Sequence, residues 1–199
     1  LPHKGTWLLV WIYPIIFLIV LTIAIFAEGK NPDAMTAHGW IDDTNMIWYV
    51  PTISLGRYFI AAYFALLIAG EYGWNTWKLV VPHAARWKLI ASKFLVASTL
   101  LYLAWIGTAL LSIVMQFVRT SMVGGTVPAG VTFGALLGNH WEMLLGGVVP
   151  MLVAAGYASL AAVLTRSTMA SVIISIVLIT FDEVLGKLVA WFSGFGLEW

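Results

Sequence analysis

The side chains that could do chemistry in this chain are its charged residues and its histidines, because the sequence contains no cysteine. Thiolate catalysis, disulfides and zinc or iron–sulfur sites with cysteine ligands are therefore excluded. Histidines could hold haem only from the middle of facing membrane helices. All four lie instead at the ends of the long apolar stretches or between them: His3, His38, His83 and His140. We therefore expect no cofactor and no metal site.

Motifs of common enzymes are missing from the sequence as well. It contains neither the H-E-x-x-H motif of zinc proteases nor the G-x-S-x-G motif of serine hydrolases. The pair Gly186-Lys187 is not a P-loop, because Phe181 stands where a P-loop requires its first glycine. We expect this chain not to be an enzyme.

The most informative charges are concentrated in one short segment, residues 71–93. It carries a single acidic residue, Glu71, and four of the ten basic residues, which are Lys78, Arg86, Lys88 and Lys93. Its apolar positions recur at spacings of three and four, as on one face of an amphipathic helix. A basic amphipathic helix can bind a cytoplasmic partner, or it can anchor the chain to anionic lipid. The residues alone leave both interpretations open.

A few charges interrupt the apolar stretches themselves. Arg57 lies about two turns inside one of them, next to Tyr58. A charge inside a bilayer is costly, so Arg57 either extends to the outer interface or faces a pathway, and the first interpretation is favoured. Asp182 and Glu183 end another apolar run, where the helix either continues or leaves the membrane. These residues are candidates for a pathway or outer gate: Arg57, Tyr58, Asp182 and Glu183.

The composition defines the class of protein. Apolar residues make up 61% of the chain and charged residues 10%, against roughly 45–50% and 25% in soluble domains. The 11 Trp and 7 Tyr are typical of proteins whose aromatic rings collect at membrane interfaces. The sequence therefore predicts an integral membrane protein.

Apolar stretches of about 20 residues predict membrane-spanning helices. Five stretches of the chain qualify, at about residues 7–27, 50–70, 94–118, 143–164 and 168–188. We find no repeat or linker between them. The fold class expected is an all-α, polytopic membrane helical bundle that forms a single domain over residues 1–199.

The basic residues also predict the orientation, because Lys and Arg are enriched in cytoplasmic loops. With the amino terminus in the cytoplasm, six of the ten basic residues fall inside: Lys4, Lys78, Arg86, Lys88, Lys93 and Arg166. We therefore predict a cytoplasmic amino terminus, a cytoplasmic segment 71–93 and two external loops, at about residues 28–49 and 119–140.

Two short motifs on the predicted cytoplasmic side resemble those of type-2 ABC (ATP-binding cassette) exporter permeases. The first is the series Glu71, Thr76-Trp77-Lys78, Pro82, Arg86 and Lys93, between the second and third predicted spans. In it Asn75 stands where the family usually has Gly, and Ala85 where it usually has Ser. The second is the turn Leu164-Thr-Arg-Ser-Thr-Met-Ala-Ser171, with the pair Arg166-Ser167. The order of spans is similar over nearly the whole chain.

The resemblance implies that residues 71–93 form a coupling helix that docks on a separate ATP-binding subunit. Its coupling residues would be Glu71, Thr76, Trp77, Lys78, Pro82, Arg86 and Lys88, and Arg166 with Ser167 would form a cytoplasmic turn. The implied assembly has two ATP-binding subunits and a second permease subunit, as a homodimer or a heterodimer. It would lie in a bacterial or archaeal cytoplasmic membrane. Membrane lipid would be a further partner, and no nucleic acid is expected to bind.

The resemblance also implies that the second and fifth spans line the pathway. The residues from Asp182 to Trp199 would form an external helical element, and a sixth span would be missing from this chain. An alternative function is a non-transport accessory or anchor subunit of a larger membrane complex. Such a subunit would have the same spans and an equally basic loop.

Overall fold

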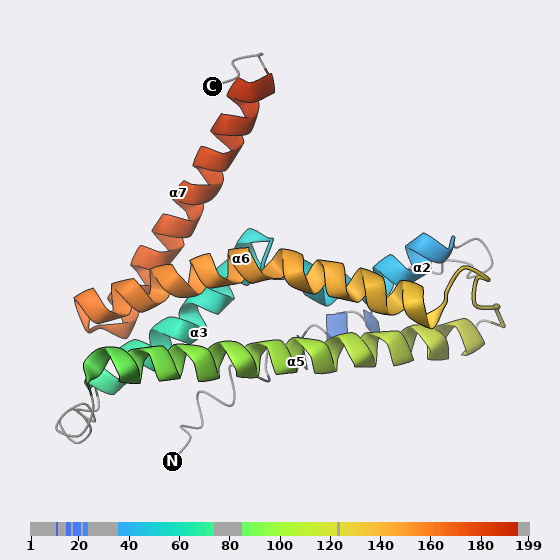
Figure 1. The fold of residues 1–199 in the computed structure, drawn as a ribbon, viewed down its shortest axis with the longest axis horizontal. Coiled ribbons are helices and arrows are strands. Elements are labelled where there is room, and N and C mark those ends of the chain that lie inside the picture. The colour runs from blue at the N-terminus through green and yellow to red at the C-terminus, as the bar shows by residue number, and fades with distance from the viewer. Residues whose placement is uncertain are drawn as a thin grey trace. The chain divides into compact units, whose positions relative to one another are not determined.

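The structure is a computed structural model that describes residues 11, 15, 16, 18–20, 22, 23, 36–73, 85–122 and 124–194. Over these residues it consists of helices and turns and contains no strand, which confirms the all-helical fold class. The elements, labelled in Figure 1, are α2 (Ala37–Thr44), the 3-10 helix η2 (Met46–Tyr49), α3 (Ser54–Gly73), α5 (Arg86–Met122), α6 (Phe133–Thr165) and α7 (Thr168–Gly194).

By length and composition, two of the described helices could cross a membrane. They are Trp87–Met122 in α5 and Phe133–Thr165 in α6, and the shorter apolar stretch Ser54–Gly70 belongs to α3. At 1.5 Å per residue, the 33 residues of α6 extend about 50 Å, well beyond the hydrocarbon thickness of about 30 Å. Membrane association is therefore supported, and the five-span arrangement and its orientation stay predictions.

The described chain divides into two compact units. Unit 1 comprises Leu1–Val50 and Val96–Val149, and unit 2 comprises Pro51–Leu95 and Pro150–Trp199. Both α5 and α6 contribute residues to each unit. On α6 the boundary falls at Pro150, which cannot donate the backbone hydrogen bond of its helical position.

Unit 1 contains a helical segment where the sequence predicts an external loop at residues 28–49. α2 begins at the N-cap Thr36, whose hydroxyl accepts a hydrogen bond from the Gly39 amide. Trp40 and Ile41 then pack with Leu136 of α6 in a small buried cluster. Residues 37–49 are therefore mainly helical despite their polar turn residues, because Trp40 and Trp48 bond to side chains of α5 and α6. The second predicted loop, residues 119–140, is shorter than expected, since α5 ends at Met122 and α6 begins at Phe133.

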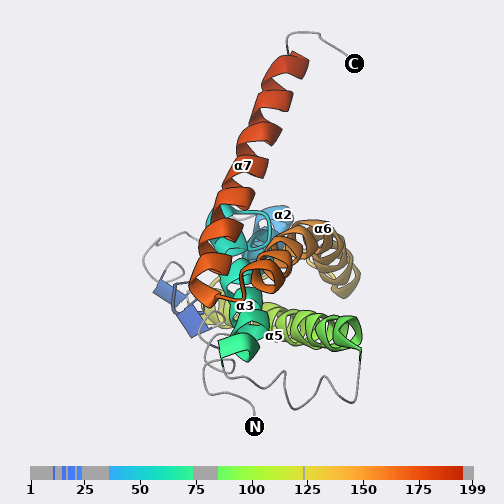
Figure 2. The same cartoon turned by 90° about the vertical axis from the view of Figure 1, so that its left-hand side faces the viewer.

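Unit 2 is built around the contact between α3 and α7, which lie side by side in Figures 1 and 2. α6 reaches α7 through a two-residue turn, Arg166-Ser167. Ile68 and Ala69 of α3 pack on Ala162 of α6, and these side chains are almost fully buried. Small residues at such contacts let helix backbones approach closely.

Two elements extend further than the sequence suggests. α7 continues without a break through Asp182 and Glu183 to Gly194, so the helix does not end at the carboxylates. α5 begins at Arg86, so the basic residues of 86–93 form its first two turns instead of the end of a separate helix. Lys and Arg are good helix formers, and no Gly or Pro separates them from the following apolar run. Residues 74–84, the middle of the expected coupling helix, lie outside the described residues.

Candidate functional site

The candidate site is a charged cluster between α3 and α7 in unit 2. Arg57 points from α3 toward the two neighbouring carboxylates of α7. Its Nη2 lies 2.7 Å from Oδ2 of Asp182, and its Nη1 lies 3.5 Å from Oε1 of Glu183. The side chain of Arg57 is only 9% exposed, whereas those of Asp182 and Glu183 are 44% and 21% exposed. Arg57 is therefore paired with carboxylates of α7, and the favoured expectation that it extends to the outer interface stays a prediction.

Hydroxyl groups complete the cluster on both sides of the ion pairs. Ser54 donates a hydrogen bond of 2.7 Å to Oε2 of Glu183, and the hydroxyls of Tyr58 and Thr180 lie 2.8 Å apart. The structure thus brings together the four residues that the sequence marks as candidates for a pathway or gate. It adds Ser54 and Thr180, each three residues before a charged member of the cluster. That spacing places them on the same helical face as the charged residues. It is the feature of the sequence from which Ser54 and Thr180 could have been predicted.

The cluster contains more negative than positive groups. One guanidinium faces two carboxylates, so the formal charges of the group sum to about −1 if all three are ionised. Bringing a charge into an apolar environment is costly unless it is paired, and both carboxylates reduce that cost for Arg57. The Nε of Arg57 is buried and has no hydrogen-bond partner among the described residues. The cluster therefore joins the two helices through the two terminal nitrogens of the guanidinium.

The predicted cytoplasmic turn is a tight, hydrogen-bonded structure. Arg166 has a left-handed backbone with φ of 55°, which is uncommon for a residue other than glycine. Its amide donates to the carbonyl of Ala162, which ends α6, and Ser167 caps the start of α7 through the amide of Ala170. The Arg166 guanidinium lies 5.9 Å from the ring centre of Tyr72, near the end of α3. The turn is therefore linked to the helix that leads into the predicted coupling segment.

The predicted coupling residues are described only in part. Lys88 lies on the first turn of α5 with its Nζ 5.7 Å from the ring centre of the exposed Trp87. Glu71 and Arg86 lie on helical backbone near the ends of α3 and α5. Thr76, Trp77, Lys78 and Pro82 lie outside the described residues.

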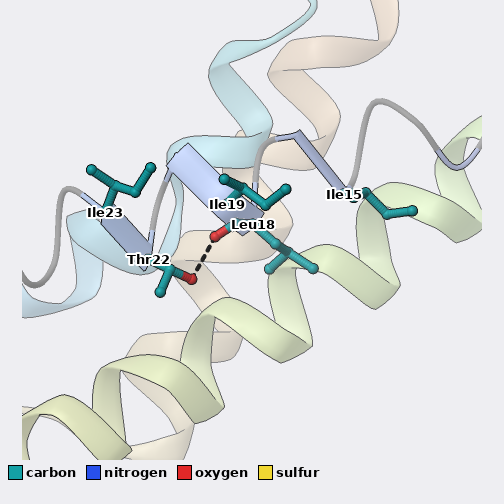
Figure 3. Close-up of a pocket in the computed structure, with 5 residues that line it drawn as sticks. All are labelled: Ile15, Leu18, Ile19, Thr22 and Ile23. Atoms are coloured by element: carbon teal, nitrogen blue, oxygen red, sulfur yellow. Dashed lines mark hydrogen bonds between the residues drawn. The ribbon is translucent and has the colours of Figure 1, made fainter.

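An open apolar hollow of about 310 Å³ lies along the helical residues near the amino terminus. Figure 3 shows its lining: Ile15, Leu18, Ile19, Thr22 and Ile23. The one hydroxyl there, that of Thr22, donates to the carbonyl of Leu18 at 2.6 Å. Among the described lining residues, the hollow therefore has no free polar group that could orient a ligand. Within the described ranges no three His, Asp or Glu side chains are grouped as metal ligands.

Comparisons with known proteins identify no relative of this chain. No protein family matches it, and neither a characterised protein nor a solved structure does. Over the described residues, the fold is all-helical, with two helices able to cross a membrane and a charged cluster between α3 and α7 in which Arg57 is buried.

Proposed function

We propose that this chain is the permease subunit of an ATP-driven exporter of the type-2 ABC class. It would form half of a transmembrane pathway and receive its energy from a separate ATP-binding subunit. The supporting observation is the contact between α3 and α7 through Arg57, Asp182 and Glu183. These helices correspond to the second and fifth predicted spans, which would line the pathway in such a permease.

The chemistry of the cluster fits a pathway better than it fits a passive membrane anchor. Ionisable groups within apolar helices are costly, and they are usually found at ion, proton or substrate pathways. The contact at Arg57 can open as a unit, because the same guanidinium holds both carboxylates. An anchor could join α3 to α7 with apolar side chains alone, as Ile68 and Ala69 join α3 to α6.

The energy input would arrive on the opposite side of the same helices. The coupling segment follows α3 directly, and Arg166 contacts Tyr72 one residue before the end of α3. A displacement of the segment by an ATP-binding subunit would therefore act on α3 and, through the 165–168 turn, on α7. Since α3 and α7 also share the charged cluster, one movement would reach both proposed pathway helices.

The test is purification of the full chain from its native membranes, followed by assay of ATP hydrolysis in the purified complex. We expect a P-loop ATPase to co-purify and to hydrolyse ATP. The variant Arg86→Glu with Lys88→Glu should insert normally but lose most of the association, because charge complementarity steers docking. Lys30→Glu, in the first predicted external loop, is the control and should retain it. Co-purification of a complex without ATPase activity would support the accessory-subunit alternative instead.

A further inference from the structure

The further inference concerns the cap segment, defined here as α2 with η2, residues 37–49 in unit 1. Three of its side chains donate hydrogen bonds to residues of α5 and α6. Trp40 donates its indole N–H to the Thr120 hydroxyl at 3.1 Å, and Asn45 donates to the side-chain oxygen of Asn139. Trp48 donates its indole N–H to Nδ1 of His140 at 2.8 Å. The cap segment is thus docked by specific polar contacts as well as by apolar packing.

The bond from Trp48 determines the protonation state of His140. An indole N–H can only donate, so Nδ1 of His140 must carry a lone pair. His140 is therefore neutral with its proton on Nε2, which lies 3.3 Å from the hydroxyl of Thr44. The Thr44 hydroxyl in turn donates to the carbonyl of Ile41 at 2.6 Å, so it accepts from Nε2. All three hydrogen bonds, from Trp48 to His140, from His140 to Thr44 and from Thr44 to Ile41, can form together only with this tautomer of His140.

A second proton on His140 would break this series of hydrogen bonds at the bond from Trp48. Both ring nitrogens of an imidazolium are donors, so Nδ1 would face the Trp48 N–H with no acceptor between them. Its bonding partners are buried, Trp48 being 4% exposed and Thr44 1% exposed, so a cation on the half-buried His140 would be only partly solvated. His140 precedes the fourth predicted span, and burial lowers the pKa of His140 below its ordinary value of 6.5.

Other charges on α2, α5 and α6 do not reverse the lowering of the His140 pKa. Asp43 of α2 lies 3.6 Å from Arg119 of α5 and accepts a hydrogen bond from Gln116, so its charge is shared with a buried cation. Further charged or titratable groups on the cap segment and the start of α6 include His38 and Asp42 of α2, 3.0 Å apart, Tyr49 of η2 and Glu142 of α6. Glu142 is two residues from His140 and therefore lies on the other side of α6.

We propose that His140 is a proton-binding site that controls docking of the cap segment. The neutral side chain holds η2 on α6, and the protonated one releases it. The docked state binds fewer protons than the released state, so its stability increases with pH. Docking is complete above the ordinary histidine pKa of about 6.5 and weakens as the pH falls through it.

Hydrogen exchange of the backbone amides of residues 40–50 tests the proposal on the full chain in detergent or nanodiscs. After correction for intrinsic exchange, we expect their protection to fall roughly tenfold between pH 7.5 and pH 5, the effect of one lost buried hydrogen bond. His140→Asn places an amide oxygen near the position of Nδ1 and cannot be protonated there. It should keep its protection and show no pH dependence. Unchanged protection in the wild-type chain across this range would overturn the proposal.

Two further variants separate His140 from the other histidine of the cap segment. His38→Gln removes an exposed histidine on α2 and should retain the wild-type pH dependence. Trp48→Phe removes the donor and should have low protection already at pH 7.5, with a smaller further loss at pH 5. If His140→Asn retained the pH dependence and His38→Gln abolished it, the proton site would be His38 and the proposal would be wrong. None of these results depends on whether the chain exports a substrate.

Discussion

The guanidinium of Arg57 and the carboxylate of Asp182 lie 2.7 Å apart, although 125 residues separate them in the sequence. The contact fixes the register of the first turn of α3, which carries Arg57, against the middle of α7, which carries Asp182. Glu183 is a second acceptor for Arg57. Pairing with Arg57 therefore explains how α7 can continue through two carboxylates while it stays packed against α3.

Removing the cation should cost more stability than removing either anion. Arg57→Gln leaves Glu183 and Asp182 without their partner and should destabilise the protein by about 3 kcal/mol. Asp182→Asn leaves Arg57 paired with Glu183 and affects a side chain that is 44% exposed, so we expect a loss of about 1 kcal/mol or less. Thermal unfolding in detergent measures both losses. Equal losses in the two variants would show that the ion pairs do not join the helices.

Trp40 should be the most sensitive position of the cap segment. It is 0% exposed, and its ring packs against Phe117 at 4.9 Å between ring centres. Trp40→Phe loses the bond to Thr120 and should cost about 1 kcal/mol, whereas Trp40→Ala also leaves a cavity and should cost about 3–5 kcal/mol. The matched control is Trp87→Ala, because Trp87 is 68% exposed, and its effect should stay within about 0.5 kcal/mol. The same unfolding measurement compares all three variants, and a Trp40→Ala loss no larger than that of Trp87→Ala would contradict the docked cap.

Two substitutions at Arg166 can separate the energetic cost of its backbone conformation from the contribution of its side-chain contact. Arg166→Ala and Arg166→Gly both lose the contact with the Tyr72 ring, but only glycine adopts a φ of 55° without strain. We therefore expect the Gly variant to be more stable than the Ala variant by about 1 kcal/mol. Midpoints of thermal unfolding provide the comparison. An Ala variant as stable as the Gly variant would mean that the turn relaxes to another conformation.

The predicted orientation can be tested in this chain directly, because it contains no cysteine. A single cysteine in place of Asn75 should react with a membrane-impermeant thiol reagent only after the cells are permeabilised. A cysteine in place of Met46, an exposed residue of η2, should react in intact cells. The opposite pattern would invert the topology and remove the basis for a cytoplasmic coupling segment.

The sequence by itself predicted an integral membrane protein and the helical fold, whose helices the structure confirms over the described residues. Its apolar runs are long and nearly free of charge, and such runs can satisfy their backbone groups in a bilayer only as helices or closed barrels. It also marked the individual residues of the candidate site, because a charge within an apolar stretch stands out whatever its partner is. The ends of helices were less certain, as at Arg86, since Lys and Arg continue a helix as readily as they flank it.

Only the tertiary structure decided what those residues contact. Arg57 was expected at the outer interface and Asp182 at the end of a helix, because each charge alone is costly in an apolar environment. The structure removes much of that cost by pairing them, and a pair separated by 125 residues leaves no trace in local spacing. The cap segment gives the same lesson. Its polar residues predict a loop. Trp40 and Trp48, however, donate to acceptors that are 80 and 92 residues away in the sequence. These long-range hydrogen bonds, together with the buried surface, stabilise helices that the local sequence does not specify.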